Sequence, residues 1–415
     1  MPALLSSTRR DFLIGSGALF AWAHTPRLAR AEGRDPRVLV VVLRGALDGL
    51  AVAAPVGDPD WVKLRGDRAL VLDGKPPALP LDSFFALNPA MPNLHRLYQA
   101  QQATIVHASA TPYRDRSHFD GQDVLESGFS KPGSYDSGWL NRALSRLEAD
   151  GRVNPRGSRA FAVGPVTPLV VRGPAPLMTW MPRQPLPASE DTQARLLDLY
   201  VHTDPKLARA LEGRKDLVAL ARDSGMDTKP AGDQNPALVG IARVREYAAE
   251  VVGSAARYLA QPDGPRVGAL SFTGWDTHIN EGAASGALAG LLGVLDGAIA
   301  AFERNMGAAW GETVVVLITE FGRTARINGT DGTDHGTGTV ALLAGGALRG
   351  GRVIADWPGL KDANLYENRD LAATTDLRAV LKGVLKDHLR LDDTVLVNSV
   401  FPGSADIKPM PGLLA

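Results

Sequence analysis

The sequence predicts a three-layer α/β/α sandwich with a mostly parallel central sheet. Two observations support this prediction: short apolar runs recur along the chain, and stretches with helical periodicity lie between them. Strands that alternate with amphipathic helices favour a layered fold, because each helix buries its apolar stripe against the sheet. With 415 residues, 45% of them hydrophobic and 22% charged, the chain has ample material for a core.

Five short runs are the expected strands. Three of them are nearly continuous apolar segments without alternation, which is typical of strands that are covered on both faces in a parallel sheet. In chain order the five runs are 38–43, 104–108, 267–272, 313–318 and 340–344.

Two helices follow from the spacing of apolar residues. One repeats apolar side chains at i, i+3, i+4 and i+7 over 288–302, and the other does so over 241–251. The stretch 191–261 is mostly helical without a strong strand, so we expect a helical insertion there, within a single domain over 35–415. The proline-rich sequence at 165–187 is expected to be a loop that leads into this insertion.

The N-terminal segment 1–31 is predicted to be a twin-arginine signal peptide. The pair Arg9-Arg10 is followed by an apolar stretch over 12–23 and then by Ala29-Arg30-Ala31, which resembles a cleavage site. The apolar stretch is too short to span a bilayer, and a surface helix is the alternative for it. No later segment reaches the roughly 18 uninterrupted apolar residues of a membrane span. We therefore expect a periplasmic or secreted protein, with no integral membrane segment after signal removal.

Composition and missing motifs argue against several classes of function. Lys and Arg together number 45, as do Asp and Glu, and no basic block stands out, so nucleic acid is not an expected partner. Cysteine is absent, which excludes disulfides, thiolate metal sites, iron–sulfur clusters and cysteine nucleophiles. The chain has no G-x-S-x-G elbow, no phosphate-binding P-loop and no G-x-G-x-x-G after a strand.

Ionisable residues gather in the loops at the ends of the expected strands. In an open parallel sheet the loops at the carboxyl ends of the strands face one crevice, where ligands bind. Four strands are followed by such residues, and a further set lies just before 340–344. Carboxylates and imidazoles suit Zn²⁺, Mn²⁺, Mg²⁺ or Ca²⁺, so we expect a divalent metal whose identity stays open. The candidate ligands are Asp48, His118, Asp276, His278, Glu320 and His335.

Each candidate ligand also has an ordinary alternative role. An Asp after a strand is often a turn former or a helix N-cap. A lone His is often a hydrogen-bonded surface or core group. It is their coincidence in four separate strand-end loops that favours one shared site.

The same loops hold candidates for catalysis on an anionic substrate. Arg114, Arg116 and Arg323 are candidates to clamp phosphate or sulfate, and the alternative for them is charge balance for nearby carboxylates. Ser117 is the best-placed hydroxyl for a nucleophile that a metal would activate. Its alternative role is to cap the helix expected after it.

The strand-end motifs together resemble those of a known family. They are Arg44 to Asp48 (RGALD), Ser117 to Asp120 (SHFD) with Gln122-Asp123, Gly274 to His278 (GWDTH), Thr319 to Thr324 (TEFGRT) and Thr333 to Gly336 (TDHG). The family is the domain of unknown function 1501 family, whose members commonly carry twin-arginine signals. This family in turn resembles a distant branch of the alkaline phosphatase and sulfatase superfamily.

The resemblance implies an alkaline-phosphatase-like α/β/α sandwich that hydrolyses small anionic esters of phosphate or sulfate at one or two metals. It implies that Asp48, after the first strand, is a metal ligand. The sequence departs from the superfamily pattern in two places. One residue separates Asp276 from His278, where the pattern has three, and Phe321 stands where an Asp-His-Gly motif has its histidine. One imidazole ligand is therefore missing, and His118 is the candidate to replace it from a different loop.

The leading hypothesis is an exported, metal-dependent hydrolase of phosphate or sulfate esters. The alternative is a catalytically inactive periplasmic protein that uses the same fold to bind a ligand or a partner protein, because the nucleophile has no secure counterpart. A third hypothesis, redox chemistry with a bound organic cofactor, rests on the export route alone.

Overall fold

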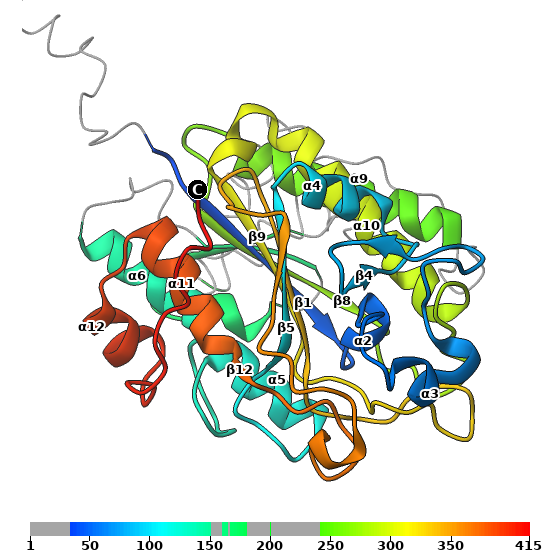
Figure 1. Ribbon diagram of the computed structural model, residues 1–415. Helices are drawn as coiled ribbons and strands as arrows, with labels where there is room; N and C mark the ends of the chain where they lie inside the picture. The colour runs from blue at the N-terminus through cyan, green and yellow to red at the C-terminus, as the bar shows by residue number, and fades with distance from the viewer. Residues whose placement is uncertain (1–33, 151–159, 165–166, 181–199, 201–240) are drawn as a thin grey trace, which may run out of the picture. The chain divides into compact units, whose positions relative to one another are not determined.

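The structure is a computed structural model in which residues 34–150, 160–164, 167–180, 200 and 241–415 are described (Figure 1). The chain divides into two units, Met1–Asp35 and Pro36–Ala415. The predicted signal peptide at 1–31 and most of the predicted insertion at 191–261 lie outside the described residues. The described end of that insertion, α9 (Ile241–Leu259), is helical as expected.

A nine-stranded sheet forms the centre of the second unit. Its central strand, β1 (Arg37–Arg44), pairs in parallel with β8 (Val267–Thr273) on one side and with β9 (Thr313–Ile318) on the other. Beyond β9, strand β10 (Thr339–Ala344) is antiparallel both to β9 and to β5 (Ala103–Ala110). These are the five predicted strands, and the mostly parallel sheet confirms the predicted fold class.

Four short strands that were not predicted extend the two sides of the sheet. On one side β6 (Ala160–Val163) pairs with β8, and β7 (Leu177–Trp180) pairs with β6. On the other side β11 (Arg352–Ile354) and β12 (Thr375–Asp376) pair with β5. Strand β7 corrects the expectation of a loop over 165–187. It is only four residues long and has prolines close to both ends, so a scan for longer apolar runs misses it.

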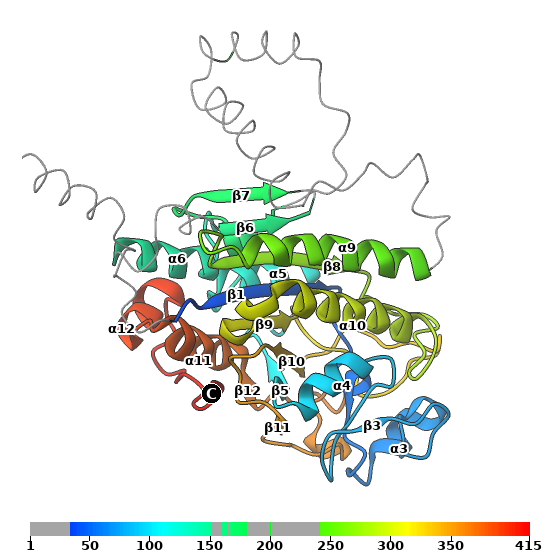
Figure 2. The same ribbon diagram turned by 90° about the horizontal axis from the view of Figure 1, so that it is seen from above.

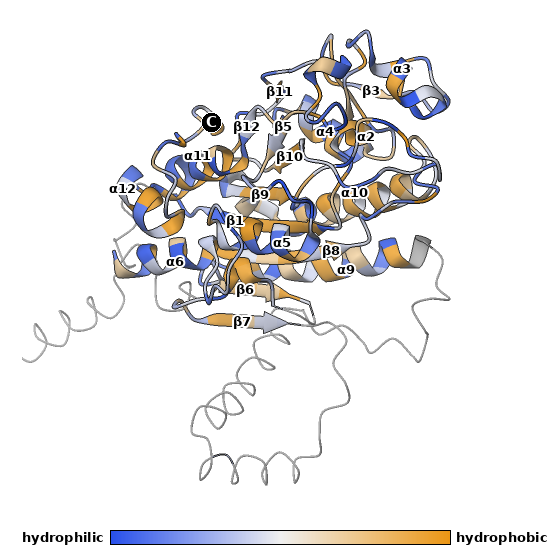
Figure 3. Cartoon of the chain, turned by 90° about the horizontal axis from the view of Figure 1, so that it is seen from below, coloured by the Kyte–Doolittle hydropathy of each residue, from blue (hydrophilic) through white to orange (hydrophobic). Residues whose placement is uncertain are grey.

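Helices cover both faces of the sheet and complete the three layers (Figures 1 and 2). One layer contains α4 (Pro92–Gln99), α9 and α10 (Ala287–Met306). The other contains α5 (His118–Ser127), α6 (Trp139–Ala149) and α11 (Leu377–Leu389). Hydrophobic residues run through the strands and the helices that enclose them (Figure 3).

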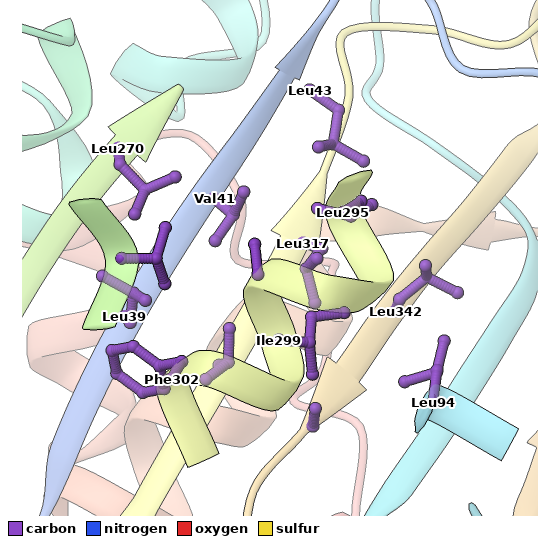
Figure 4. Packing of buried hydrophobic residues seen from close by; sticks show 14 of the residues in the cluster. Leu39, Val41, Leu43, Leu94, Leu270, Leu295, Ile299, Phe302, Leu317 and Leu342 are labelled. Atoms are coloured by element: carbon purple, nitrogen blue, oxygen red, sulfur yellow. The ribbon is translucent and has the colours of Figure 1, made fainter. Parts of the chain in front are cut away.

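The alternation of side chains along β1 divides the core between the two faces. Leu39, Val41 and Leu43 belong to the cluster that includes Ile299 and Phe302 of α10, and Figure 4 shows this packing. The intervening side chains Val38, Val40 and Val42 belong to the cluster on the opposite face. A strand that is apolar on both faces in this way explains why its sequence shows no polar alternation.

The remaining elements are short. A three-stranded sheet of β2 (Ala53–Ala54), β4 (Ala86–Leu87) and β3 (Leu79–Pro80) shares a small core with α2 (Gly49–Val52) and α3 (Trp61–Arg65). The others are α12 (Asp393–Val395), the 3₁₀ turns η1 (Gly66–Arg68), η2 (Leu169–Val171), η4 (Gly307–Glu312) and η5 (Asp362–Asn364), and the π-helical turn η6 (Leu396–Val400). Within the described ranges, no helix combines the length and the apolar character that crossing a membrane requires.

The strand directions bring five loops to one edge of the main sheet. Strands β1, β5, β8 and β9 run in the same direction, so their carboxyl ends lie at one edge. Strand β10 runs in the opposite direction, so its beginning lies at that edge as well. The loop before β10 therefore meets the loops that follow the other four strands, which is what a shared site requires.

Candidate metal centre

Three side chains from three different loops meet at this edge of the sheet. They are His118 at the start of α5, Asp276 after β8 and His335 before β10, and their ligand atoms lie within 4.8 Å of one another. The His118 Nε2 is 2.9 Å from the His335 Nε2 and 3.4 Å from the Asp276 Oδ2. The His335 Nε2 is 3.1 Å from the Asp276 Oδ1. Three of the six predicted ligands thus come together.

A fourth predicted ligand, His278, lies beside this group. Its Nε2 is 2.9 Å from the Asp276 Oδ1 and 3.1 Å from the His335 Nε2. The single residue between Asp276 and His278 therefore allows both side chains to face the same place. We call His118, Asp276, His278 and His335 the histidine centre.

Each imidazole of the histidine centre has its Nδ1 next to a group that can only accept a hydrogen bond. The Nδ1 of His118 is 2.8 Å from the Glu320 Oε1. The Nδ1 of His335 is 2.9 Å from the carbonyl oxygen of Arg116, and the Nδ1 of His278 is 3.3 Å from the Asp334 Oδ1. Carboxylates and carbonyls accept hydrogen bonds, and the Nδ1 contacts of His118 and His335 are shorter than their Nε2 contacts with Asp276, so the ring proton is assigned to Nδ1 in these two imidazoles. His278 has a carboxylate next to each of its nitrogens.

With the proton on Nδ1, the His118 and His335 rings present Nε2 lone pairs to each other and to Asp276. Lone pairs on nitrogen atoms 2.9 Å apart repel each other unless a proton or a cation lies between them. Hydrogen bonds on the far side of the ring are typical of metal-binding histidines, because they fix the tautomer that binds. Three imidazole nitrogens and a carboxylate fit a divalent transition-metal ion, Zn²⁺ above all.

The local charges favour the cation-binding form of Asp276 and His335 and the protonated form of His118. Burial would raise the pKa of Asp276, but the hydrogen bond and charge of Arg323 outweigh it and hold that pKa below its usual value. Burial and the adjacent His118 lower the pKa of His335. The hydrogen bond to Glu320 raises the pKa of His118. As the pH falls, a proton therefore competes with a cation at His118 before it does so at His335.

Phe321 supports the two facing histidine rings. Its ring stacks on His118 with the centroids 5.0 Å apart, and it lies 5.3 Å from the His335 ring. The side chain is buried. The residue at the expected histidine position is thus a packing surface, and His118 reaches the centre from α5 as the sequence analysis anticipated.

Glu320 stands behind His118 and does not face the centre. Its Oε1 accepts hydrogen bonds from the Gly45 amide at 2.8 Å and from the Gln122 Nε2 at 3.2 Å, in addition to the His118 contact. The carboxylate is fully buried, and these donors outweigh burial and lower its pKa. This placement corrects the expectation of a direct ligand, because the oxygen that is nearest to His118 already holds its ring.

Asp48 also lies outside the histidine centre. Its Oδ1 caps α2 through the amides of Leu50 and Ala51. Both carboxylate oxygens receive hydrogen bonds from Arg65, at 2.5 and 3.0 Å, and both side chains are buried. The structure therefore corrects the expectation that Asp48 faces the same point as Asp276: it is the helix N-cap that the sequence analysis gave as its alternative role.

The predicted arginines have different surroundings. Arg323 is buried and donates to Asp276 through Nη1 and to the Thr333 Oγ1 through Nε, so it orients a candidate ligand. Arg116 pairs with Asp370 and Glu367, while its carbonyl holds His335. Arg114 donates to backbone carbonyls of its own loop. Among the described residues, neither the Arg114 guanidinium nor the Arg116 guanidinium bonds a side chain of the centre.

Ser117 occupies the position before α5, directly next to His118. Its side chain does not cap the helix. Its amide donates to the hydroxyl of Tyr113 at 3.2 Å. Its role as a nucleophile stays a prediction.

Residues that the sequence analysis did not select complete the site. Asp334 holds His278, and Thr333 connects Arg323 to the buried Glu281, whose carboxylate accepts from the Thr333 Oγ1 at 2.7 Å. Arg369 donates to the carbonyl of His335. Asp334 and Thr333 lie next to His335 in the TDHG motif, which could have suggested them. Glu281 and Arg369 lie in loops with no recognisable pattern.

Sequence comparison gives one match. The model of a family described as "Protein of unknown function (DUF1501)" matches residues 35–401. No curated protein shows a significant sequence match to the chain.

Several solved structures are similar to the chain at low sequence identity. A phosphonate monoester hydrolase of Agrobacterium radiobacter is 13% identical with a TM-score of 0.35, over 77% of this chain and 70% of that one. A sulfatase from Pseudoalteromonas sp. is 12% identical with a TM-score of 0.35, over 85% and 69%. A protein in the alkaline phosphatase superfamily from Vibrio parahaemolyticus is 14% identical with a TM-score of 0.34, over 75% and 60%. TM-scores of this size do not indicate a shared activity.

Proposed function

This chain belongs to the DUF1501 family of proteins of unknown function, and we propose that it is a metal-dependent hydrolase of phosphate or sulfate esters. One observation carries the proposal: the Nε2 atoms of three histidines and the carboxylate of Asp276 lie within hydrogen-bond distance of one another at an edge of the sheet that is open to solvent. The side chain of Asp276 is 41% exposed, so a substrate can reach it.

The residues that would hold the ion are His118, Asp276 and His335, with His278 beside them. Nitrogen-rich donor sets favour Zn²⁺, and Mn²⁺ is the next candidate, whereas Mg²⁺ and Ca²⁺ prefer sets composed of oxygen. A divalent ion bound there would polarise an ester oxygen and neutralise the charge that develops on it.

The surrounding residues prepare this centre. Glu320 and the Arg116 carbonyl keep the His118 and His335 rings in the binding tautomer, and Arg323 keeps Asp276 ionised. Arg369 lies beside them, with a half-exposed side chain that bonds the carbonyl of His335 and pairs with Asp370. Ser117, next to His118, remains our candidate nucleophile, and a water molecule is the alternative.

The test combines metal analysis with turnover. We expect the purified protein to retain about one divalent transition-metal ion per chain after dialysis and to hydrolyse members of a panel of phosphate and sulfate monoesters. His335→Ala should lose both the ion and the turnover. His95→Ala is the matched control, because His95 lies on α4 and bonds the Pro80 carbonyl away from the centre. Protein that binds no metal and turns over neither ester class would refute the proposal.

The second candidate is a binding protein without catalysis, located in the periplasm or outside the cell like the hydrolase. It is supported by the lack of a secure nucleophile. It requires that His335→Ala leave the biological role intact. For either candidate we propose export through the twin-arginine route, because Arg9-Arg10 starts the expected signal. Replacing this pair by Lys-Lys should leave the protein in the cytoplasm.

A further inference from the structure

Three exposed hydrophobic side chains belong to segments that build or support the histidine centre. Within the described part of the chain, the large hydrophobic residues that are exposed are Val62, Leu72, Phe119, Val244, Ile279 and Tyr366. Phe119 directly follows His118 and is 90% exposed, and Ile279 directly follows His278 and is 63% exposed. Single exposed apolar residues are normal on a protein surface, but this pair flanks two histidines of one site.

The position of Phe119 on its helix directs it toward the edge that carries the centre. Helix α5 begins at His118, so Phe119 lies in its first turn. The Cα–Cβ bonds of a helix tilt toward its N-terminus, which here is the end next to the centre. The buried residues Gly121, Val124 and Leu125 hold the rest of the helix against the core. Phe119 is therefore presented at the rim by a fixed element.

Tyr366 reaches the same rim through the residues that support His335. The Arg116 guanidinium carbon lies 5.7 Å from the centroid of the Tyr366 ring, and the Arg116 carbonyl is the group that accepts from the His335 Nδ1. Tyr366 and Asp370 exchange backbone hydrogen bonds of 2.9 and 3.0 Å, so Tyr366 is held in a closed turn. The same turn contains Arg369, which bonds the carbonyl of His335.

The exposed apolar side chains thus lie beside a candidate metal centre. An amphiphilic anion matches this combination, because its charged group would meet the ion of the centre while its organic group covers the apolar side chains. Removing side chains such as Phe and Ile from water is favourable, so a ligand whose organic group covers them gains affinity from that contact.

Building on the proposed function, we propose that Phe119, Ile279 and Tyr366 form an apolar rim that binds the organic group of the ester. The substrate class is accordingly monoesters of phenols or of other bulky apolar alcohols. Esters of methanol or other short alcohols would meet the same centre without this contact, and they are expected to be poor substrates.

The test separates the rim from the chemistry by using ligands that cannot be hydrolysed as esters. Calorimetry on the metal-loaded protein would compare phenylphosphonate with methylphosphonate, which carry the same charged group. We expect phenylphosphonate to bind at least about tenfold more tightly, and the Phe119→Ala/Ile279→Ala double variant to remove most of that difference. Leu72→Ala is the control, because Leu72 is an exposed hydrophobic residue outside the loops that build the centre.

The outcomes distinguish this inference from the function on which it rests. Phenylphosphonate binding that depends on the rim, without turnover of any ester, would keep the rim and refute the hydrolase. Equal kcat/KM for phenyl and methyl esters in the unchanged protein would keep the hydrolase and refute the rim. Equal binding of the two phosphonates, or no binding of either, would refute the rim as well. The rim would also be refuted if the double variant lost only binding to phospholipid vesicles, because the apolar residues would then contact a membrane surface and not a substrate.

Discussion

Asp48 and Asp276 both follow a strand at the same edge of the sheet, yet their surroundings differ completely. Asp48 is buried, caps α2 and uses both oxygens for Arg65. Asp276 is 41% exposed, and three histidines share its oxygens with one arginine. The comparison shows that an aspartate after a strand does not define a site by itself. What decides its role is which groups the rest of the fold places opposite it.

The two regions are connected through a buried carboxyl group. Glu281 lies near the Asp48–Arg65 pair, whose charges affect its pKa. It also accepts from Thr333, which in turn accepts from the Arg323 that holds Asp276. The closed ion pair and the open centre are therefore parts of one polar network, and substitutions can show how far they act independently.

The same substitution at Asp48 and at Asp276 tests whether the two aspartates have different structural roles. Asp48→Asn leaves the buried Arg65 without its anion, and we expect it to lower the free energy of unfolding by about 3–5 kcal/mol. Asp276→Asn also removes the anion that pairs with a buried arginine, Arg323, but this carboxylate is 41% exposed, so we expect a smaller loss than that of Asp48→Asn. Denaturant unfolding of the metal-free proteins measures both values. Equal losses would mean that the two aspartates have the same structural role.

Glu281 makes the free energy of unfolding depend on pH. Burial, and then the charge of Asp48, raise the pKa of Glu281 from 4.5 to about 7. The folded protein therefore holds this proton over a range in which the unfolded chain has released it. Because the folded state binds more protons there, the free energy of unfolding falls as the pH rises from 4.5 toward 7, and the loss is complete above that range.

Glu281→Gln removes this dependence. Relative to the unchanged protein, the variant should gain up to about 3 kcal/mol between pH 5 and pH 8, measured by denaturant unfolding at both values. Glu303→Gln is a suitable control, because Glu303 pairs with Arg96 on a surface helix away from this network. If the difference between variant and parent does not change with pH, the carboxyl group is ionised throughout and the network is anionic.

The fold could be predicted well because its signals are local. Continuous apolar runs and helical spacing identified the five long strands and the two long helices, whereas β7 was missed since four residues between prolines carry little pattern. The centre was predicted in part, because strand ends and histidines are visible in a sequence. The different roles of Asp48 and Asp276 depend on Arg65, which lies 17 residues from Asp48 in the sequence. No local sequence pattern predicts that contact.

Within the histidine centre, one ring is held by a buried carboxylate, Glu320, and another by an exposed one, Asp334. Glu320→Gln keeps the shape of a buried carboxylate but weakens its hold on the His118 proton. We expect a loss of 10- to 100-fold in Zn²⁺ affinity, which is typical when such a supporting carboxylate is changed. Because Glu320 raises the pKa of His118, the same substitution should lower that pKa in a histidine titration by NMR.

Asp334→Asn is the matched change at the exposed side, where the carboxylate contacts the His278 Nδ1 at 3.3 Å and is screened by solvent. Its effect on Zn²⁺ affinity should stay below about fivefold. A loss of Zn²⁺ affinity as large as that of Glu320→Gln would show that His278 contributes to binding as much as His118 does. The ion would then have four ligands, His118, Asp276, His278 and His335, and not three.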